Sequence, residues 1–70
     1  MTVQEQLGAN IRRHRTQLGL TQMQLADLCD MDMADISKLE LGKKDAQTST
    51  IVRIARGLRV APGELFAGIG

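Results

Sequence analysis

The sequence predicts an all-α fold, a compact domain of five short helices that spans residues 1–70. Apolar residues recur at intervals of three and four along most of the chain, which is the spacing of one face of a helix. Two segments begin with a capping box, in which a threonine is followed three residues later by Glu or Gln. No segment alternates between apolar and polar residues as a half-buried strand would. We therefore expect no sheet.

The first helix is predicted for residues 3–18. Thr2 is its expected N-cap, and Glu5 completes the capping box. Gly19 suits the left-handed conformation that often ends a helix. The expected inward face of this helix consists of Leu7, Ile11 and Leu18.

The second and third helices are predicted for residues 21–29 and 32–41. Thr21 and Gln24 form the capping box of the first of these, and Asp32 is the expected N-cap of the next. Only about three residues separate the two helices, so they cannot lie flat against one another and must cross steeply. Such a pair has the geometry of a helix-turn-helix, a motif whose second helix enters the major groove of DNA.

The last two helices are predicted for residues 48–58 and 62–67. The first has an apolar stripe, although Gly57 within it costs about 1 kcal/mol relative to Ala. The second begins at Pro62, because proline is favoured as a first helical residue. The expected apolar residues of these helices are Ile51, Ile54, Ala55, Leu58, Leu65 and Phe66.

Charge is nearly balanced but unevenly distributed. Nine basic and eight acidic residues give a net charge of +1, and five of the acids fall between positions 27 and 40. This acidity is unexpected for a helix that contacts nucleic acid. Asp32 and Asp35 have another role at the start of the third helix, where the helix dipole favours a carboxylate by about 0.3–1 kcal/mol.

Several classes of function are disfavoured by composition. A single cysteine and a single histidine cannot form a zinc site, so we expect no metal. The sequence has no nucleophile–base pair and no glycine-rich phosphate loop, so we expect no enzyme, no cofactor and no small-molecule substrate. No signal peptide or membrane-spanning stretch is present, and the lone cysteine suits a reducing cytoplasm.

Three strings of the sequence follow a specific pattern: "LGANIRRHRTQLGLTQMQLA", "DISKLELGKK" and "IVRIARGLRVAPGELF". With them the chain resembles the Cro/repressor (XRE) family of helix-turn-helix regulators, which includes lambdoid phage repressors and restriction–modification controller proteins. The match extends from about Leu7 to Phe66. The resemblance implies a five-helix domain like the DNA-binding domain of lambda repressor, in a bacterial or phage protein that acts at the nucleoid.

Some positions depart from the family pattern. Asp30 and Arg59 stand where family members usually have Gly, and Ala46 where they have Pro. Arg59 is therefore expected to adopt a left-handed conformation at a cost of roughly 1 kcal/mol. Ala61 replaces a usual Ser cap, and Leu41 replaces a residue that is often polar or basic beside the phosphates.

The resemblance and the helical spacing together indicate which residues contact DNA. The outward positions of the third helix, expected to touch base edges, are Met33, Ala34, Ser37 and Lys38. The expected phosphate contacts are Thr21, Gln22, Lys43 and Lys44. Asp35 is a further candidate, because it could accept a hydrogen bond from a cytosine amino group.

Arg15 and Glu40 lie on faces that should point inward. By resemblance they form a partly buried, bidentate ion pair that ties the first helix to the third. We expect this pair to be structural and not catalytic, with a cost of about 3–5 kcal/mol for removing one partner from a deeply buried pair.

The predicted function is that of a sequence-specific, double-stranded DNA-binding transcriptional regulator, a small repressor or controller protein. One helix reads too few base pairs, so we expect a homodimer on a palindromic operator. Its interface is expected to include Leu65, Phe66 and Ile69. The alternative is a protein-interaction module of the same fold, such as an antitoxin-like partner with a weakened DNA surface; the acidic block and Leu41 favour it, and Lys38 opposes it.

Overall fold

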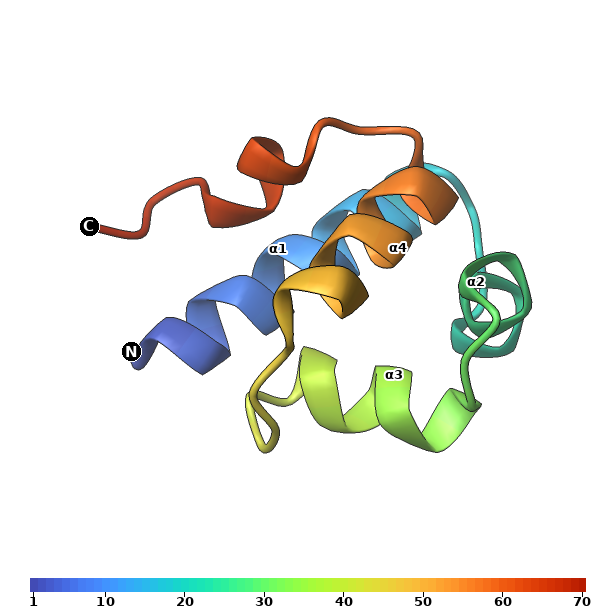
Figure 1. Cartoon of the computed structure of the whole chain (residues 1–70), viewed down its shortest axis with the longest axis horizontal. Coiled ribbons are helices and arrows are strands. Elements are labelled where there is room, and N and C mark those ends of the chain that lie inside the picture. The colour runs from blue at the N-terminus through green and yellow to red at the C-terminus, as the bar shows by residue number, and fades with distance from the viewer.

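A computed structural model describes the whole chain, residues 1–70. It contains four α-helices followed by one 3₁₀ helix and no strand (Figure 1): α1 (Val3–Gln17), α2 (Gln22–Cys29), α3 (Met33–Glu40), α4 (Thr48–Leu58) and η1 (Pro62–Phe66). The all-α prediction is confirmed. The prediction of five α-helices is wrong in its last element. No helix has the length and hydropathy that crossing a lipid bilayer requires.

The last element, Pro62–Phe66, is a short 3₁₀ helix and not an α-helix. The peptide N–H of Glu64 donates to the carbonyl of Ala61 at 2.9 Å, which closes the tighter 3₁₀ turn. Asn10 of α1, which is fully buried, donates from Nδ2 to the carbonyls of Leu65 and Ala67, both at 2.8 Å. These bonds anchor the segment to α1, so it needs no further helical turn to satisfy those carbonyls.

Both capping boxes predicted from the sequence are present at the starts of α1 and α2. In the first box Thr2 also holds the carboxylate of Glu5 by backbone and side-chain hydrogen bonds, which lowers the pKa of Glu5. Asp32 occupies the N-cap position of α3, but its side chain makes no capping hydrogen bond, so the predicted cap is wrong in this respect.

The helices enclose a single apolar core. It includes most of the apolar residues predicted for α4. Leu18, predicted to face inward from the first helix, is instead its C-cap and half exposed. Burial raises the pKa of the Cys29 thiol, as expected for a small core residue. The core residues are Leu7, Ile11, Leu25, Ala26, Cys29, Ile36, Leu39, Ile54, Ala55, Leu58 and Leu65.

Glycine at position 8 allows α1 and α3 to approach very closely. A Cβ atom there would lie 2.6 Å from the carbonyl oxygen of Glu40 and closer still to that of Leu39. Both obstacles are backbone atoms at the end of α3, which cannot rotate away as a side chain can. The close approach sets the position of α3 against α1, and sequence spacing alone did not reveal it.

Two residues other than glycine adopt the left-handed conformation, Asp30 after α2 (φ 55°) and Arg59 after α4 (φ 59°). Asp tolerates this region better than most residues. Arginine does not, so the strain predicted from the sequence falls on Arg59.

Arg59→Gly should therefore stabilise the domain by about 1 kcal/mol, because glycine adopts this conformation without steric cost. The matched control is Arg56→Gly, which removes the same side chain from the last turn of α4, where glycine should destabilise by up to about 1 kcal/mol. Urea unfolding of both variants measures the two changes. Equal changes of the same sign would contradict the assignment of strain to Arg59.

Candidate nucleic-acid interface

A short turn joins α2 to α3, and the two helices cross steeply. In Figure 1, α2 is seen end-on while α3 runs across the bottom of the view. Asp30 makes the turn by its left-handed conformation, and the guanidinium of Arg53 on α4 donates to its carbonyl. This contact from Arg53 supports the turn, and a helix-turn-helix geometry results.

Four residues of α3 form what we call the outer face: Met33, Ala34, Ser37 and Lys38. Met33, Ala34 and Lys38 are exposed, and Ser37 is partly exposed. Their side chains make no hydrogen bond or ion pair within the chain. Lys38 provides the only charge of this face, and Leu41, which is also exposed, follows at the end of α3. Side chains of this kind are available to an external partner.

The start of α2 lies beside this helix with its capping box formed. The hydroxyl of Thr21 accepts a hydrogen bond from the peptide N–H of Gln24 at 3.0 Å, and the N–H of Thr21 donates to the side chain of Gln24 at 2.8 Å. The first peptide N–H groups of α2 therefore have a fixed direction. Free N–H groups at a helix start, together with the helix dipole, are suited to a phosphate.

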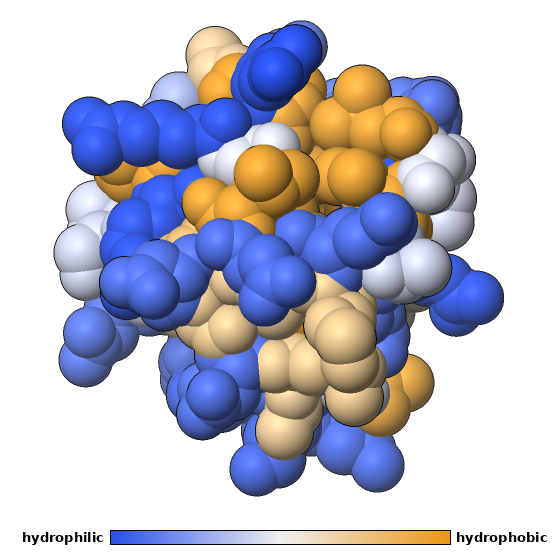
Figure 2. Space-filling model, turned by 90° about the vertical axis from the view of Figure 1, so that its right-hand side faces the viewer, coloured by the Kyte–Doolittle hydropathy of each residue, from blue (hydrophilic) through white to orange (hydrophobic).

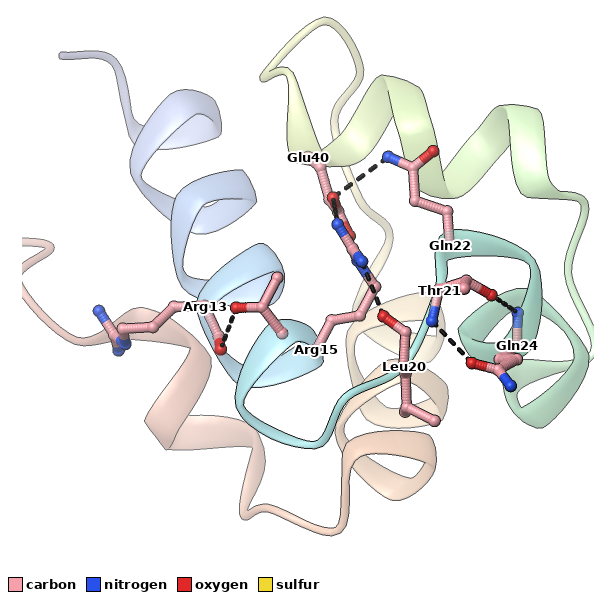
Figure 3. A network of polar contacts seen from close by, with 8 residues as sticks. Arg13, Arg15, Leu20, Thr21, Gln22, Gln24 and Glu40 are labelled. Carbon is pink, nitrogen blue, oxygen red and sulfur yellow. Dashed lines mark hydrogen bonds and ion pairs between the residues drawn. The ribbon is translucent and has the colours of Figure 1, made fainter.

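Arg15 of α1 and Glu40 at the end of α3 meet between the two helices (Figure 3). Arginine Nε and one terminal nitrogen donate to the two carboxylate oxygens at 2.7 and 2.9 Å, a bidentate arrangement. The side chains are only 11% and 3% exposed. The hydrogen bond to Glu40 raises the pKa of Arg15, and the third guanidinium nitrogen donates to the carbonyl of Leu20 at 2.8 Å. The pair ties α1 to the end of α3.

The same carboxylate also holds Gln22. Its side-chain Nε2 donates to Oε1 of Glu40 at 3.2 Å, as Figure 3 shows. The residue expected to meet a phosphate is thus oriented by the buried ion pair. The sequence does not predict this contact between Gln22 and Glu40, since no spacing rule connects positions 18 residues apart on different helices.

The acidic residues that looked unfavourable in the sequence lie on another side of α3. Five aspartates border a hollow of about 560 Å³ between the α2–α3 turn, the loop after α3 and α4; they are Asp27, Asp30, Asp32, Asp35 and Asp45. Two basic residues, Lys44 and Arg53, border it with them. We call this the acidic hollow. None of these carboxylates belongs to the outer face.

Asp35 and Lys44 are paired across the acidic hollow. The ammonium of Lys44 donates to the carboxylate of Asp35 at 3.1 Å, and both side chains are partly exposed. Asp35 therefore has a partner within the chain, unlike the residues of the outer face. Lys43 is exposed, and its side chain makes no hydrogen bond or ion pair within the chain.

At the C-terminus the predicted dimer surface needs a correction. Leu65 is 0% exposed and belongs to the core, so it cannot contact another chain. Ile69 packs against the core and is half-buried, whereas Phe66 remains exposed. Leu65 turns inward because Asn10 holds its carbonyl against α1. No pattern in the sequence predicts that this asparagine is buried.

Residues 6–67 match the model of a family described as a helix-turn-helix domain. The restriction-modification controller protein C.AhdI from Aeromonas hydrophila is 32% identical, with a TM-score of 0.87 over 89% of this chain and 94% of that one. The clp gene regulator ClgR from Corynebacterium glutamicum is 25% identical (TM-score 0.89, 93% and 69% covered). A hypothetical transcription factor, NHTF from Neisseria, is 29% identical (TM-score 0.89, 93% and 75% covered).

Proposed function

The chain belongs to the helix-turn-helix domain family, and from this premise we propose that it is a sequence-specific regulator that binds a palindromic operator in double-stranded DNA as a homodimer. The observation that carries the proposal is the outer face of α3, whose side chains have no hydrogen bond or ion pair within the chain. The opposite side of the helix is held by the core and by the bond from Arg15 to Glu40. A helix that reads DNA needs free side chains on one face and rigid packing against the domain on the other.

In the proposed complex, the outer face meets base edges in the major groove. Lys38 donates to guanine O6 and N7, and Ser37 forms a hydrogen bond with either base of a pair. Met33 and Ala34 pack against thymine methyl groups. The start of α2 meets the backbone, with the N–H groups that Thr21 fixes and the amide of Gln22 directed at a phosphate.

Lys43 and Lys44 add phosphate contacts beyond the end of α3. Lys43 is free to do so, whereas Lys44 first has to exchange or share its bond to Asp35. We therefore assign Asp35 an indirect role, in which its carboxylate positions Lys44, in place of a direct base contact. Leu41 contributes no charge, which leaves Lys38 and Lys43 as the principal cations of the surface.

The homodimer is proposed because one α3 specifies too few base pairs to define a site. Two copies related by a two-fold axis would read half-sites about one helical turn apart. The C-terminal segment supports such an interface with Phe66, which is exposed, and with the partly exposed Ile69. Similarity to a restriction-modification controller protein from Aeromonas and to a clp gene regulator from Corynebacterium supports a regulatory role.

Selection of bound sequences from random duplex DNA tests the proposal. A two-fold symmetric consensus would establish binding and pairing together. A consensus without symmetry would contradict the homodimer alone. No enrichment at low salt would contradict DNA binding and would favour the protein-interaction module.

On the selected duplex, Lys38→Gln combined with Lys43→Gln should lower affinity about 10- to 100-fold, because one base contact and one phosphate contact are lost. The control is Arg56→Gln combined with Arg59→Gln, which removes the same net charge from α4 and its end. Fluorescence anisotropy at several salt concentrations measures both. Equal losses would mean that only net charge matters and would count against a defined interface.

A further inference from the structure

A second depression lies at the ends of three helices, away from the outer face. It has a volume of about 360 Å³ and is bordered by Leu18, Leu20, Leu28, Arg56, Gly57 and Arg59. We call it the apolar hollow. Leu18 and Leu28 are each more than half exposed. Their apolar surface contributes little to the core.

Figure 2 views the molecule from the side of α2 and shows a contiguous orange patch in its upper half, bordered by hydrophilic side chains. Helix α3 lies at the bottom of Figure 1. Figure 2 is rotated from Figure 1 about the vertical axis, so α3 is also at the bottom of Figure 2. This apolar patch is therefore well above the helix proposed to read DNA. A partner seated there would leave the outer face free.

Two arginines at the border of the apolar hollow have no carboxylate of their own. The ion pairs of the chain join Arg15 to Glu40, Lys44 to Asp35 and Arg53 to Asp30, all on other surfaces. Arg56 and Arg59 take part in none of them. Leucines bordered by unpaired guanidinium groups form a surface that is complementary to an apolar segment carrying acids.

Arg59 holds its place at this border in a left-handed conformation. Glycine would remove the strain, yet it would also remove one of the two cations beside the leucines. Backbone strain at a residue that contributes nothing to the core is consistent with a role for its side chain on the surface.

We propose that the apolar hollow is the docking site of an acidic, amphipathic helix of a partner protein, with its leucine-type side chains over Leu18 and Leu28 and its carboxylates on Arg56 and Arg59. A helix laid into an apolar groove is a common mode of peptide recognition. A second copy of this chain fits poorly, since a two-fold contact presents the same surface on both sides and so brings like-charged arginines together.

The test uses the whole chain and a displayed library of random peptides long enough for about four helical turns. The expected enriched peptides combine acids with leucine-type residues at helical spacing. No enrichment, or enrichment of neutral or basic peptides only, would overturn the proposal. Self-association that is lost on substitution of Leu28 would replace the partner with a second copy and would overturn it as well.

Substitutions then locate the bound peptide. Leu28→Gln should weaken its binding about tenfold or more, because a central apolar anchor is lost. Met23→Gln is the matched control: Met23 is 59% exposed and Leu28 58%, both on α2, but only Leu28 borders the hollow. Equal effects of the two substitutions would overturn the assigned site.

The arginine variants separate binding from stability. Arg59→Gly and Arg56→Gly should each weaken peptide binding about three- to tenfold, with a reduced dependence on salt. Their stabilities should change in opposite directions, so unfolding cannot explain a loss that both share. Unchanged peptide affinity in both variants would overturn the role of the cations. DNA binding should persist in each, which keeps this test independent of the proposed function.

Discussion

Glu40→Gln is expected to lower the free energy of unfolding by about 3–5 kcal/mol and the Tm by more than about 10 °C. The substitution leaves the guanidinium of Arg15 in a site where only 11% of that side chain is exposed, without its counter-charge. Arg15 cannot escape the cost by releasing its proton, because an arginine stays protonated in any accessible pH range. Thermal and urea unfolding followed by circular dichroism measure the loss.

The matched control is Asp35→Asn, which makes the same chemical change in the exposed pair with Lys44. It should cost less than about 1 kcal/mol, since water solvates both groups when the pair is broken. A Tm of Glu40→Gln that stays close to that of the unsubstituted chain would refute the structural role of the buried pair.

Glu40→Gln also tests whether the buried ion pair positions the proposed DNA-binding surface. The carboxylate accepts a hydrogen bond from Gln22 in addition to those from Arg15, whereas a glutamine offers a single acceptor oxygen for all of them. The substitution should therefore weaken the bond that orients Gln22, an expected phosphate contact. DNA affinity measured below the unfolding transition should fall further than in Gln22→Ala, because both α3 and the start of α2 lose their support. An affinity equal to that of Gln22→Ala would limit the effect to the glutamine.

Local signals predicted most of the helices. The capping boxes at Thr2 and Thr21 and the left-handed Gly19 depend on neighbouring residues, so a sequence window contains all the information that they need. The left-handed Arg59 followed from a family pattern and the position of a helix end. The outer face of α3 followed from helical spacing, because Ile36 and Leu39 face the core and the opposite side of the helix must then face outward.

The missed features all depend on contacts between distant segments. Asn10 reads as a polar residue on a helix, and only the position of the last segment makes it a buried anchor for Leu65 and Ala67. The same contact removed Leu65 from the predicted dimer surface. Likewise, the sequence shows an acidic block around Asp35, whereas its location in the acidic hollow depends on how α4 packs against α3. Periodicity along one helix cannot supply such information.

Several of these contacts between distant segments hold α3 in position. Arg15 holds its end through Glu40, Arg53 holds the turn before it, and Gly8 sets its distance from α1. A helix of eight residues has little stability alone, so its precision in reading DNA must come from this support.

Gly8→Ala is expected to destabilise the domain by about 3 kcal/mol, although the same change in an ordinary helix interior stabilises by about 0.5–1 kcal/mol. The new methyl group would overlap the carbonyl oxygens of Leu39 and Glu40, and only a shift of α3 away from α1 could relieve the overlap. That shift would also stretch the ion pair between Arg15 and Glu40. The measurement is the free energy of unfolding in urea, with DNA affinity measured where the variant is still folded.

Gly63→Ala is the control, because a Cβ atom at that position meets nothing within 4 Å and its backbone needs no left-handed conformation. This variant should have nearly the stability of the unsubstituted chain. The contrast isolates steric overlap from the general effect of replacing glycine on the unfolded chain. If Gly8→Ala proved as stable as Gly63→Ala, α1 and α3 would have to be able to separate freely. A DNA surface held by their close contact would then be excluded.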